Sequence, residues 1–185
     1  MTEQLFMDKE SEKKENKKKS GLSGGRKVAY CGMLTALALI FSYVEAILPI
    51  QIGIPGVKLG LANLVVLMGF EFLAPGEVLA VSISRILLAG FLFGSGATIL
   101  YSLAGGLLSF FVMLVLRKIG SFSVIGISAA GGVTHNMGQL IVACLVVQNI
   151  SLAWYLPVLV IAGTITGVCM GMLCKWVMRV AKRMF

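Results

Sequence analysis

The chain has 185 residues, of which 58% are hydrophobic and only 13% charged, with a mean hydropathy of +0.94. A soluble domain is about 45–50% apolar and about 25% charged, so this composition excludes an ordinary soluble protein. Apolar runs of about 20 residues instead predict an all-α, polytopic membrane protein. The net charge of +8 does not indicate a nucleic-acid partner, because eight of the 16 Lys and Arg residues precede Val28 and no basic face carries interleaved aromatic residues.

The first 27 residues differ in composition from the rest of the chain. They are rich in Lys, Glu, Ser and Gly, which predicts a disordered, basic cytoplasmic tail over residues 1–27 and a transmembrane domain over residues 28–185. The first apolar run extends from Val28 to Leu48. A helix of this length is about 31 Å long, close to the hydrocarbon thickness of about 30 Å.

Breaks rich in Gly and Pro divide the remaining sequence into further apolar runs. The run that follows the Pro49–Lys58 loop is short for a full span, so we expect it to be tilted or partly re-entrant. Six transmembrane helices are predicted in total. The five that follow the first run are expected at Leu59–Leu73, Pro75–Phe93, Ala97–Leu116, Val124–Val147 and Leu152–Met178.

Positive residues at the ends of these runs predict the orientation in the membrane. Lys and Arg residues lie in the N-terminal tail, at Arg117 and Lys118, and in the C-terminal segment KWVMRVAKRMF. The positive-inside rule therefore puts both termini in the cytoplasm. Lys58 is the exception, because this topology places it on the outer side.

The distribution of carboxylates argues against catalysis. After Glu15 the chain contains only Glu45, Glu71 and Glu77, and no Asp. A clustered carboxylate site for Mg²⁺ cannot be built from these residues, no GxSxG motif is present, and no pair of cysteines has CxxC spacing. We therefore expect no metal, no cofactor and no autonomous enzyme activity.

Arg85 lies in the middle of the apolar run VLAVSISRILLAGFLF. A charged side chain at that depth costs about 2.5 kcal/mol or more, so it must face the interior of the bundle or water. Two roles remain open for it, an ion pair with Glu45 or Glu77 and the binding of an anionic group.

A second polar group interrupts the run that begins at Val124. His135 and Gln139 are four residues apart and share a helix face with Gly131, and Asn136 is adjacent. This small, polar face suits the wall of a cavity that contacts a ligand. Hydrogen bonding across to a neighbouring helix and a proton relay are the alternatives.

Two further polar residues complete the candidate substrate site. Asn63 is an amide within the apolar segment KLGLANLV, and Lys58 precedes it in the Gly- and Pro-rich loop. A cation in a flexible outer loop could close over a substrate, although a lone loop lysine is more often only solvated. The candidate substrate-binding residues are Lys58, Asn63, Arg85, His135, Asn136 and Gln139.

Small residues recur at the spacing that lets helices approach closely in lipid. Gly163, Gly167 and Gly171 form a tandem GxxxG, for which packing within the bundle is the preferred interpretation. Gly32 and Ala36 form a small-xxx-small pair in the first run. For this pair, docking onto a partner helix is the competing interpretation.

Five segments carry a resemblance to a known family. IPGVKLGLANLVVL (54–67), SRILLAGFLFGS (84–95), YSLAGGLLSFFVM (101–113), GGVTHNMGQLIVA (131–143) and YLPVLVIAGTITG (155–167) together resemble the Gx transporter family, also labelled heptaprenyl diphosphate synthase component I. That family is similar to the S components of energy-coupling factor (ECF) transporters. The resemblance implies a six-helix bundle in the bacterial cytoplasmic membrane that binds a small molecule near its outer face.

An S component works with a transmembrane coupling protein and two ATPase subunits, so the resemblance implies these partners as well as membrane lipid. It also implies a substrate site capped by the loop from Pro49 to Lys58. Docking would use Gly32 and Ala36, which match the two alanines of the family's AxxxA-like motif, with Gly in the first place. The expected function is capture of a small molecule that is anionic or related to isoprenoids or quinones. The alternative is a non-catalytic membrane subunit of a heptaprenyl diphosphate synthase.

Overall fold

The computed structural model describes residues 24–47 and 61–184, with side chains described as far as Val180. Six α-helices account for nearly all of this part of the chain, so the predicted all-α fold is confirmed. Lys58 and most of the expected N-terminal tail lie outside the described residues. The elements in order are α2 (Gly24–Ile47), α3 (Asn63–Phe72), α4 (Pro75–Phe93), α5 (Gly96–Ile119), α6 (Val124–Val147), the 3₁₀ helix η1 (Ile150–Tyr155) and α7 (Leu156–Met184).

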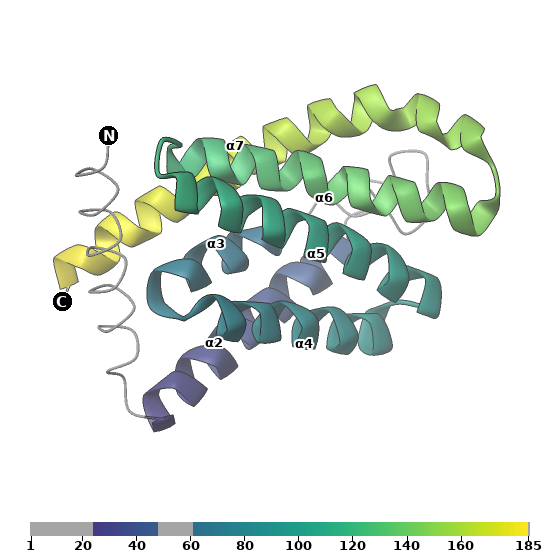
Figure 1. Ribbon diagram of the computed structural model, residues 1–185. Coiled ribbons are helices and arrows are strands. Elements are labelled where there is room, and N and C mark those ends of the chain that lie inside the picture. The colour runs from purple at the N-terminus through teal and green to yellow at the C-terminus, as the bar shows by residue number, and fades with distance from the viewer. Residues whose placement is uncertain (1–23, 48–60, 185) are drawn as a thin grey trace.

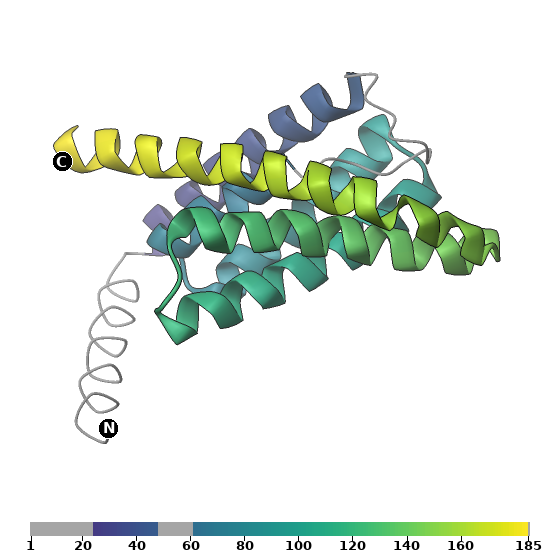
Figure 2. The same ribbon diagram turned by 90° about the horizontal axis from the view of Figure 1, so that it is seen from above.

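The helices form one antiparallel bundle (Figures 1 and 2). In both views the start of α2, the turn between α5 and α6 and the end of α7 lie at the left end of the bundle, and η1 lies at the right end. Within this arrangement α6 packs against α5 and α7, whereas α2 packs chiefly against α4. The start of α2, the end of α5 and the last turns of α7 carry Lys27, Arg117, Lys118, Lys175 and Arg179, and this end is called the basic end below.

Local capping interactions explain where several helices begin and end. The hydroxyl of Ser123 accepts a hydrogen bond from the N–H of Gly126 at 3.1 Å, which satisfies an otherwise unpaired donor in the first turn of α6. Ser95 caps α5 in the same way through Thr98. Gly120 follows the last residue of α5, and its φ of 75° is a left-handed conformation that glycine adopts at little steric cost.

Helix boundaries follow the sequence prediction closely in the middle of the chain. The bounds predicted for α4 and α6 are those observed. α5 continues to Ile119, beyond the predicted end at Leu116, because Arg117 and Lys118 form its last basic turn. The predicted start of the last helix at Leu152 is wrong, because Ile150–Tyr155 forms a separate 3₁₀ helix first.

The short helix α3 occupies the centre of the bundle. It contacts all five other α-helices, and seven of its ten residues are buried. A helix that is apolar on every side is stable only when it is surrounded by others. At 1.5 Å per residue α3 is about 15 Å long, half the thickness of a hydrocarbon core, as its short apolar run predicted.

The other five helical segments are long and apolar enough to cross a membrane. They are α2, α4, α5, α6 and the segment Ile150–Val180, which joins η1 to α7. The described part of the chain is therefore a multi-pass membrane protein in composition and length, with a sixth, shorter helix at its centre.

Glycines hold α6 and α7 in close contact. A side chain at Gly132 would collide with the carbonyl oxygen of Gly163, and one at Gly167 would lie 2.6 Å from the Cα of Ala129. Gly171 likewise faces Ile125 at 2.8 Å. The tandem GxxxG of α7 therefore serves packing within the bundle, as the preferred interpretation of the sequence stated.

Candidate functional site

Several buried polar side chains lie near the middle of α4, α5 and α6 and at the start of α3. Arg85 lies ten residues along α4 from Pro75, and Asn63 lies nine residues back along α3 from Phe72. Because α3 and α4 are joined by a tight turn, both residues stand about 14–15 Å from that turn. We call this level of the bundle the polar layer. Its members are Asn63, Ser82, Arg85, Ser102, His135 and Gln139, all buried.

Arg85 is the only charged member of the polar layer. Its side chain is 4% exposed, and within residues 24–47 and 61–184 its Nε and Nη2 atoms have no hydrogen-bond partner. Glu45 of α2 is close enough for an electrostatic attraction, which partly offsets the cost of burying the guanidinium. Of the two ion pairs considered from the sequence, only the interaction with Glu45 is found.

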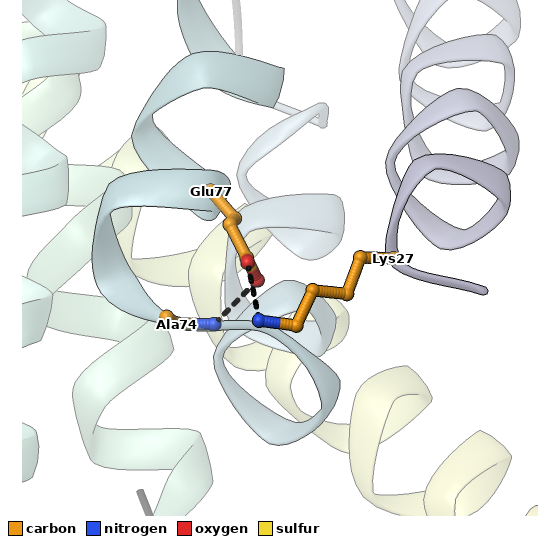
Figure 3. Close-up of polar contacts among 3 residues, drawn as sticks. All are labelled: Lys27, Ala74 and Glu77. Atoms are coloured by element: carbon orange, nitrogen blue, oxygen red, sulfur yellow. Dashed lines mark hydrogen bonds and ion pairs between the residues drawn. The ribbon is translucent and has the colours of Figure 1, made fainter. Parts of the chain in front are cut away.

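Glu77, the other candidate partner of Arg85, is engaged at the basic end. Its Oε1 lies 3.2 Å from Nζ of Lys27, and its Oε2 accepts a hydrogen bond of 3.0 Å from the N–H of Ala74 (Figure 3). This carboxylate fixes the start of α4 and ties it to α2. An ion pair between Arg85 and Glu77 was therefore a wrong alternative.

Asn63 opens α3 inside the bundle and is 6% exposed. Neither its Nδ2 nor its Oδ1 has a hydrogen-bond partner in the described parts of the chain, and the same holds for the hydroxyl of Ser102. An unsatisfied buried polar group costs about 1–3 kcal/mol. The polar layer therefore offers a cation, an amide and a hydroxyl whose hydrogen-bonding capacity the described residues leave partly unused.

His135 and Gln139 face α5, where Gly105 makes room for them. A side chain at Gly105 would lie 2.6 Å from the carbonyl oxygen of His135, 2.8 Å from Cγ of Gln139 and 3.2 Å from Cε1 of the imidazole. The space beside Gly131 is filled by Met113, whose Sδ would lie 2.6 Å from an added Cβ. This face of α6 therefore packs against α5.

Asn136 points elsewhere, although it is adjacent to His135 in the chain. Its Nδ2 donates a 2.9 Å hydrogen bond to the carbonyl oxygen of Leu159 in α7, and the residue is 1% exposed. Successive residues on a helix point about 100° apart, so one polar dipeptide reaches two neighbours. The structure thus separates Asn136 from His135 and Gln139.

The small pair on α2 lies at the surface. Gly32 and Ala36 are exposed, and nothing lies within 4 Å of a Cβ built on Gly32. This contrasts with Gly132 of α6 and with Gly163, Gly167 and Gly171 of α7, each of which faces another helix. Packing among the described residues therefore does not account for the small pair on α2.

The candidate substrate-binding residues predicted from the sequence did not include the buried serines of α4 and α5. The segment YSLAGGLLS places Ser102, Gly105, Gly106 and Ser109 at spacings of three, four and seven, so they follow one side of α5. Ser82 of α4 faces this side, since its Oγ would lie 4.0 Å from a Cβ on Gly106. Helical periodicity of small polar residues was the signal that could have found them.

Residues 24–47 and 61–184 contain no cluster of three or more His, Cys, Asp or Glu side chains that could hold a metal ion. No curated protein sequence and no solved structure matches the chain. A family model described as heptaprenyl diphosphate synthase component I, and also known as Gx transporter, matches residues 34–177. The match includes α3 to α6, α2 from Leu34 onward and most of α7, and the chain belongs to this family.

Proposed function

We propose that this protein is the membrane-embedded, substrate-binding subunit of an energy-coupled importer, similar to an ECF S component. The single observation that carries the proposal is the buried guanidinium of Arg85, which retains unused donors in the polar layer. A cation held without full pairing in an apolar bundle is a costly feature that binding of an anionic group would explain. The substrate class is a small molecule that is anionic or related to isoprenoids or quinones.

Asn63 and Ser102 suit the same role, because an amide and a hydroxyl can both donate to and accept from a polar group of the substrate. Lys58, which lies outside the described residues, is proposed to approach from the outer loop. His135 and Gln139 are proposed to contact the substrate from α6 while they pack on α5. Asn136 is proposed to support that wall through its bond to α7.

The exposed pair Gly32 and Ala36 is proposed as the docking point for a transmembrane coupling protein served by two ATPase subunits. A surface without a projecting side chain lets a partner helix approach closely in lipid. The protein would lie in the bacterial cytoplasmic membrane with both termini in the cytoplasm. Collection of Lys and Arg residues at one end of the bundle supports this orientation.

The substrate site is tested by mass spectrometry of small molecules that remain bound to the gently purified full-length protein. Arg85→Gln should lower ligand retention at least tenfold, because it removes the charge but keeps a polar side chain of similar length. Lys118→Gln, which removes an exposed cation from the end of α5, is the matched control and should retain the ligand. Equal retention by Arg85→Gln and the wild-type protein would refute the proposed site.

Docking is tested by co-purification. Gly32→Leu combined with Ala36→Leu should abolish recovery of the coupling protein and its ATPases without lowering thermal stability. Thr164→Leu with Cys169→Leu on the exposed side of α7 is the control. Recovery of the complete complex with the α2 variant would exclude this docking point.

The family description favours a second candidate, a non-catalytic membrane subunit of a heptaprenyl diphosphate synthase. In that case the protein should change the rate or product length of a catalytic prenyl synthase when the two are combined in liposomes. An unchanged product profile, together with ligand-dependent uptake, would favour the importer.

A further inference from the structure

A cavity of about 440 Å³ opens at the basic end of the bundle, between the ends of α3, α5 and α7 and the start of α6. It is separate from the polar layer, because α3 runs from Asn63 in that layer to Glu71 in the cavity wall. Eight residues of helix place these two positions about 12 Å apart. The proposed substrate site has no role for this cavity.

Charged side chains in the cavity wall are mostly positive. Arg117, Lys175 and Arg179 line it together with a single carboxylate, Glu71. Lys175 and Arg179 are four residues apart on α7, so they share a face, and like charges at that spacing repel each other. An anion bound between them would relieve this repulsion.

Arg117 is held in a fixed position beside the same cavity. Its Nη2 lies 3.5 Å from Oε1 of Glu71, and its guanidinium carbon lies 5.6 Å from the centre of the Phe70 ring. Both contacts restrain the side chain, and a guanidinium has five N–H donors. The restrained cation therefore needs little reordering to face an anion in the cavity.

The rest of the wall is apolar. Leu67, Phe122, Ile127 and Met178 contribute side chains from three helices and from the turn between α5 and α6. A ligand that fills this cavity must therefore carry an apolar portion as well as a negative charge. A simple inorganic anion would contact the cations but would leave the apolar wall without a partner.

We propose that this cavity binds an amphiphile with a phosphate or diphosphate headgroup. The headgroup contacts Arg117, Lys175 and Arg179, and the alkyl portion lies against the apolar wall. Basic pockets between transmembrane helices on the cytoplasmic side are suited to anionic headgroups. The ligand is either an anionic phospholipid of the surrounding membrane or a phosphorylated apolar molecule that enters from the cytoplasm.

The arrangement goes beyond what orientation in the membrane requires. Lys118 and Arg26 also lie at the basic end and satisfy the positive-inside rule, yet they do not line this cavity. Three cations from α5 and α7 instead surround one hollow together with its apolar wall. That difference provides a matched control for the experiment.

Full-length protein is titrated with dioleoyl phosphatidylglycerol, which is anionic, and separately with dioleoyl phosphatidylcholine, which is zwitterionic. Native mass spectrometry gives the apparent Kd of the first bound lipid. We expect the anionic lipid to bind roughly tenfold more tightly, and Lys175→Gln with Arg179→Gln to remove that preference. Lys118→Gln with Arg26→Gln, which removes the same charge elsewhere at the basic end, should leave the preference intact.

A second pair of variants separates charge from folding. Lys175→Arg with Arg179→Lys keeps both charges and should keep the preference for the anionic lipid. Loss of preference in this exchange variant would contradict the proposal, as would equal losses in the cavity and control variants. Equal binding of the two lipids by the wild-type protein would contradict it as well.

The source of the headgroup is decided by competition. Inorganic diphosphate at millimolar concentration should displace the lipid if the cavity recognises the headgroup of a soluble phosphorylated molecule. Continued lipid binding assigns the cavity to membrane phospholipid. Either source requires the dependence of lipid binding on Lys175 and Arg179. That dependence does not involve Arg85, so the lipid proposal can fail while the importer function stands, and the importer function can fail while the lipid proposal stands.

Discussion

α2 and α6 are both 24 residues long and both apolar enough to cross a membrane, yet they occupy different environments. In its most apolar 18-residue stretch, α2 buries 17% of its residues and α6 buries 44%. The difference lies in the neighbours that each helix contacts. α6 lies between α5 and α7, whereas α2 packs mainly on α4.

The same residue type consequently has opposite roles in the two helices. Gly132 of α6 is required because the backbone of α7 lies where its side chain would be, whereas Gly32 of α2 faces open space. Hydropathy cannot distinguish the two, since lipid and the interior of a bundle are both apolar. Close backbone contact identifies the glycine that packs against another helix, whereas no described residue covers Gly32.

The largest effect on stability is expected from Gly132→Ala. Its new methyl group collides with the carbonyl oxygen of Gly163, and a backbone atom cannot move aside as a side chain can. We expect a loss of about 2–3 kcal/mol in the free energy of unfolding, measured by denaturation in mixed micelles. Gly32→Ala, with no atom within 4 Å of the new Cβ, should change it by less than about 0.5 kcal/mol. Equal effects at the two positions would remove the distinction between α6 and α2.

A smaller loss is expected from Asn136→Ala. This change deletes the buried hydrogen bond from Nδ2 to the carbonyl oxygen of Leu159, which joins α6 to α7. Interhelical hydrogen bonds in membranes contribute about 0.6 kcal/mol on average and at most about 1.7 kcal/mol. We expect about 1 kcal/mol in the same denaturation measurement. Thr35→Ala on α2 serves as the control, and a stability unchanged by Asn136→Ala would show that the bond contributes nothing.

The smallest effect is expected at the contact between α2 and α4. Lys27→Gln removes the 3.2 Å ion pair with Glu77 (Figure 3), which is partly exposed at the basic end. Pairs of this kind contribute about 0.2–1 kcal/mol and weaken in salt. The stability difference from wild type should be about 0.5 kcal/mol in low salt and vanish in about 1 M salt, where the Debye length is about 3 Å. A salt-independent difference would indicate a contribution from packing instead.

Much of the fold could be predicted before the tertiary structure was known. The bounds of α4 and α6 followed from Pro75 and from the breaks between apolar runs, which act within a few residues along the chain. The late start of α7 could not be predicted, because an apolar segment rich in aromatic residues is compatible with both a 3₁₀ and an α conformation. The central position of α3 depends on five other helices, which no local pattern describes.

The candidate site was predicted in part. Burial of Arg85, Asn63 and His135 followed from their places within apolar runs, because the chain there has no aqueous surface to reach. Which helix each side chain faces was not predictable. His135 and Asn136 are adjacent in the chain, yet one lies against α5 and the other bonds to α7.

The basic cavity illustrates the same limit. Its four charged residues come from α3, α5 and α7, and in the sequence the cations were evident only as signals of orientation. These charged residues form a site with an apolar wall only because the ends of α3, α5 and α7 lie together in the folded protein.

The sequence alone determined that this protein is an all-α membrane bundle, where α4 and α6 begin and end, and which polar residues must be buried. These properties depend on local capping and on the cost of exposing polar groups to lipid. The tertiary structure decided which glycines are contacts and which are free surface, and which polar groups share a layer or a cavity. Contacts of this kind form between residues that are distant in the chain and lie within a few ångströms in space. The neighbours of a residue in the sequence do not determine which distant residues it contacts.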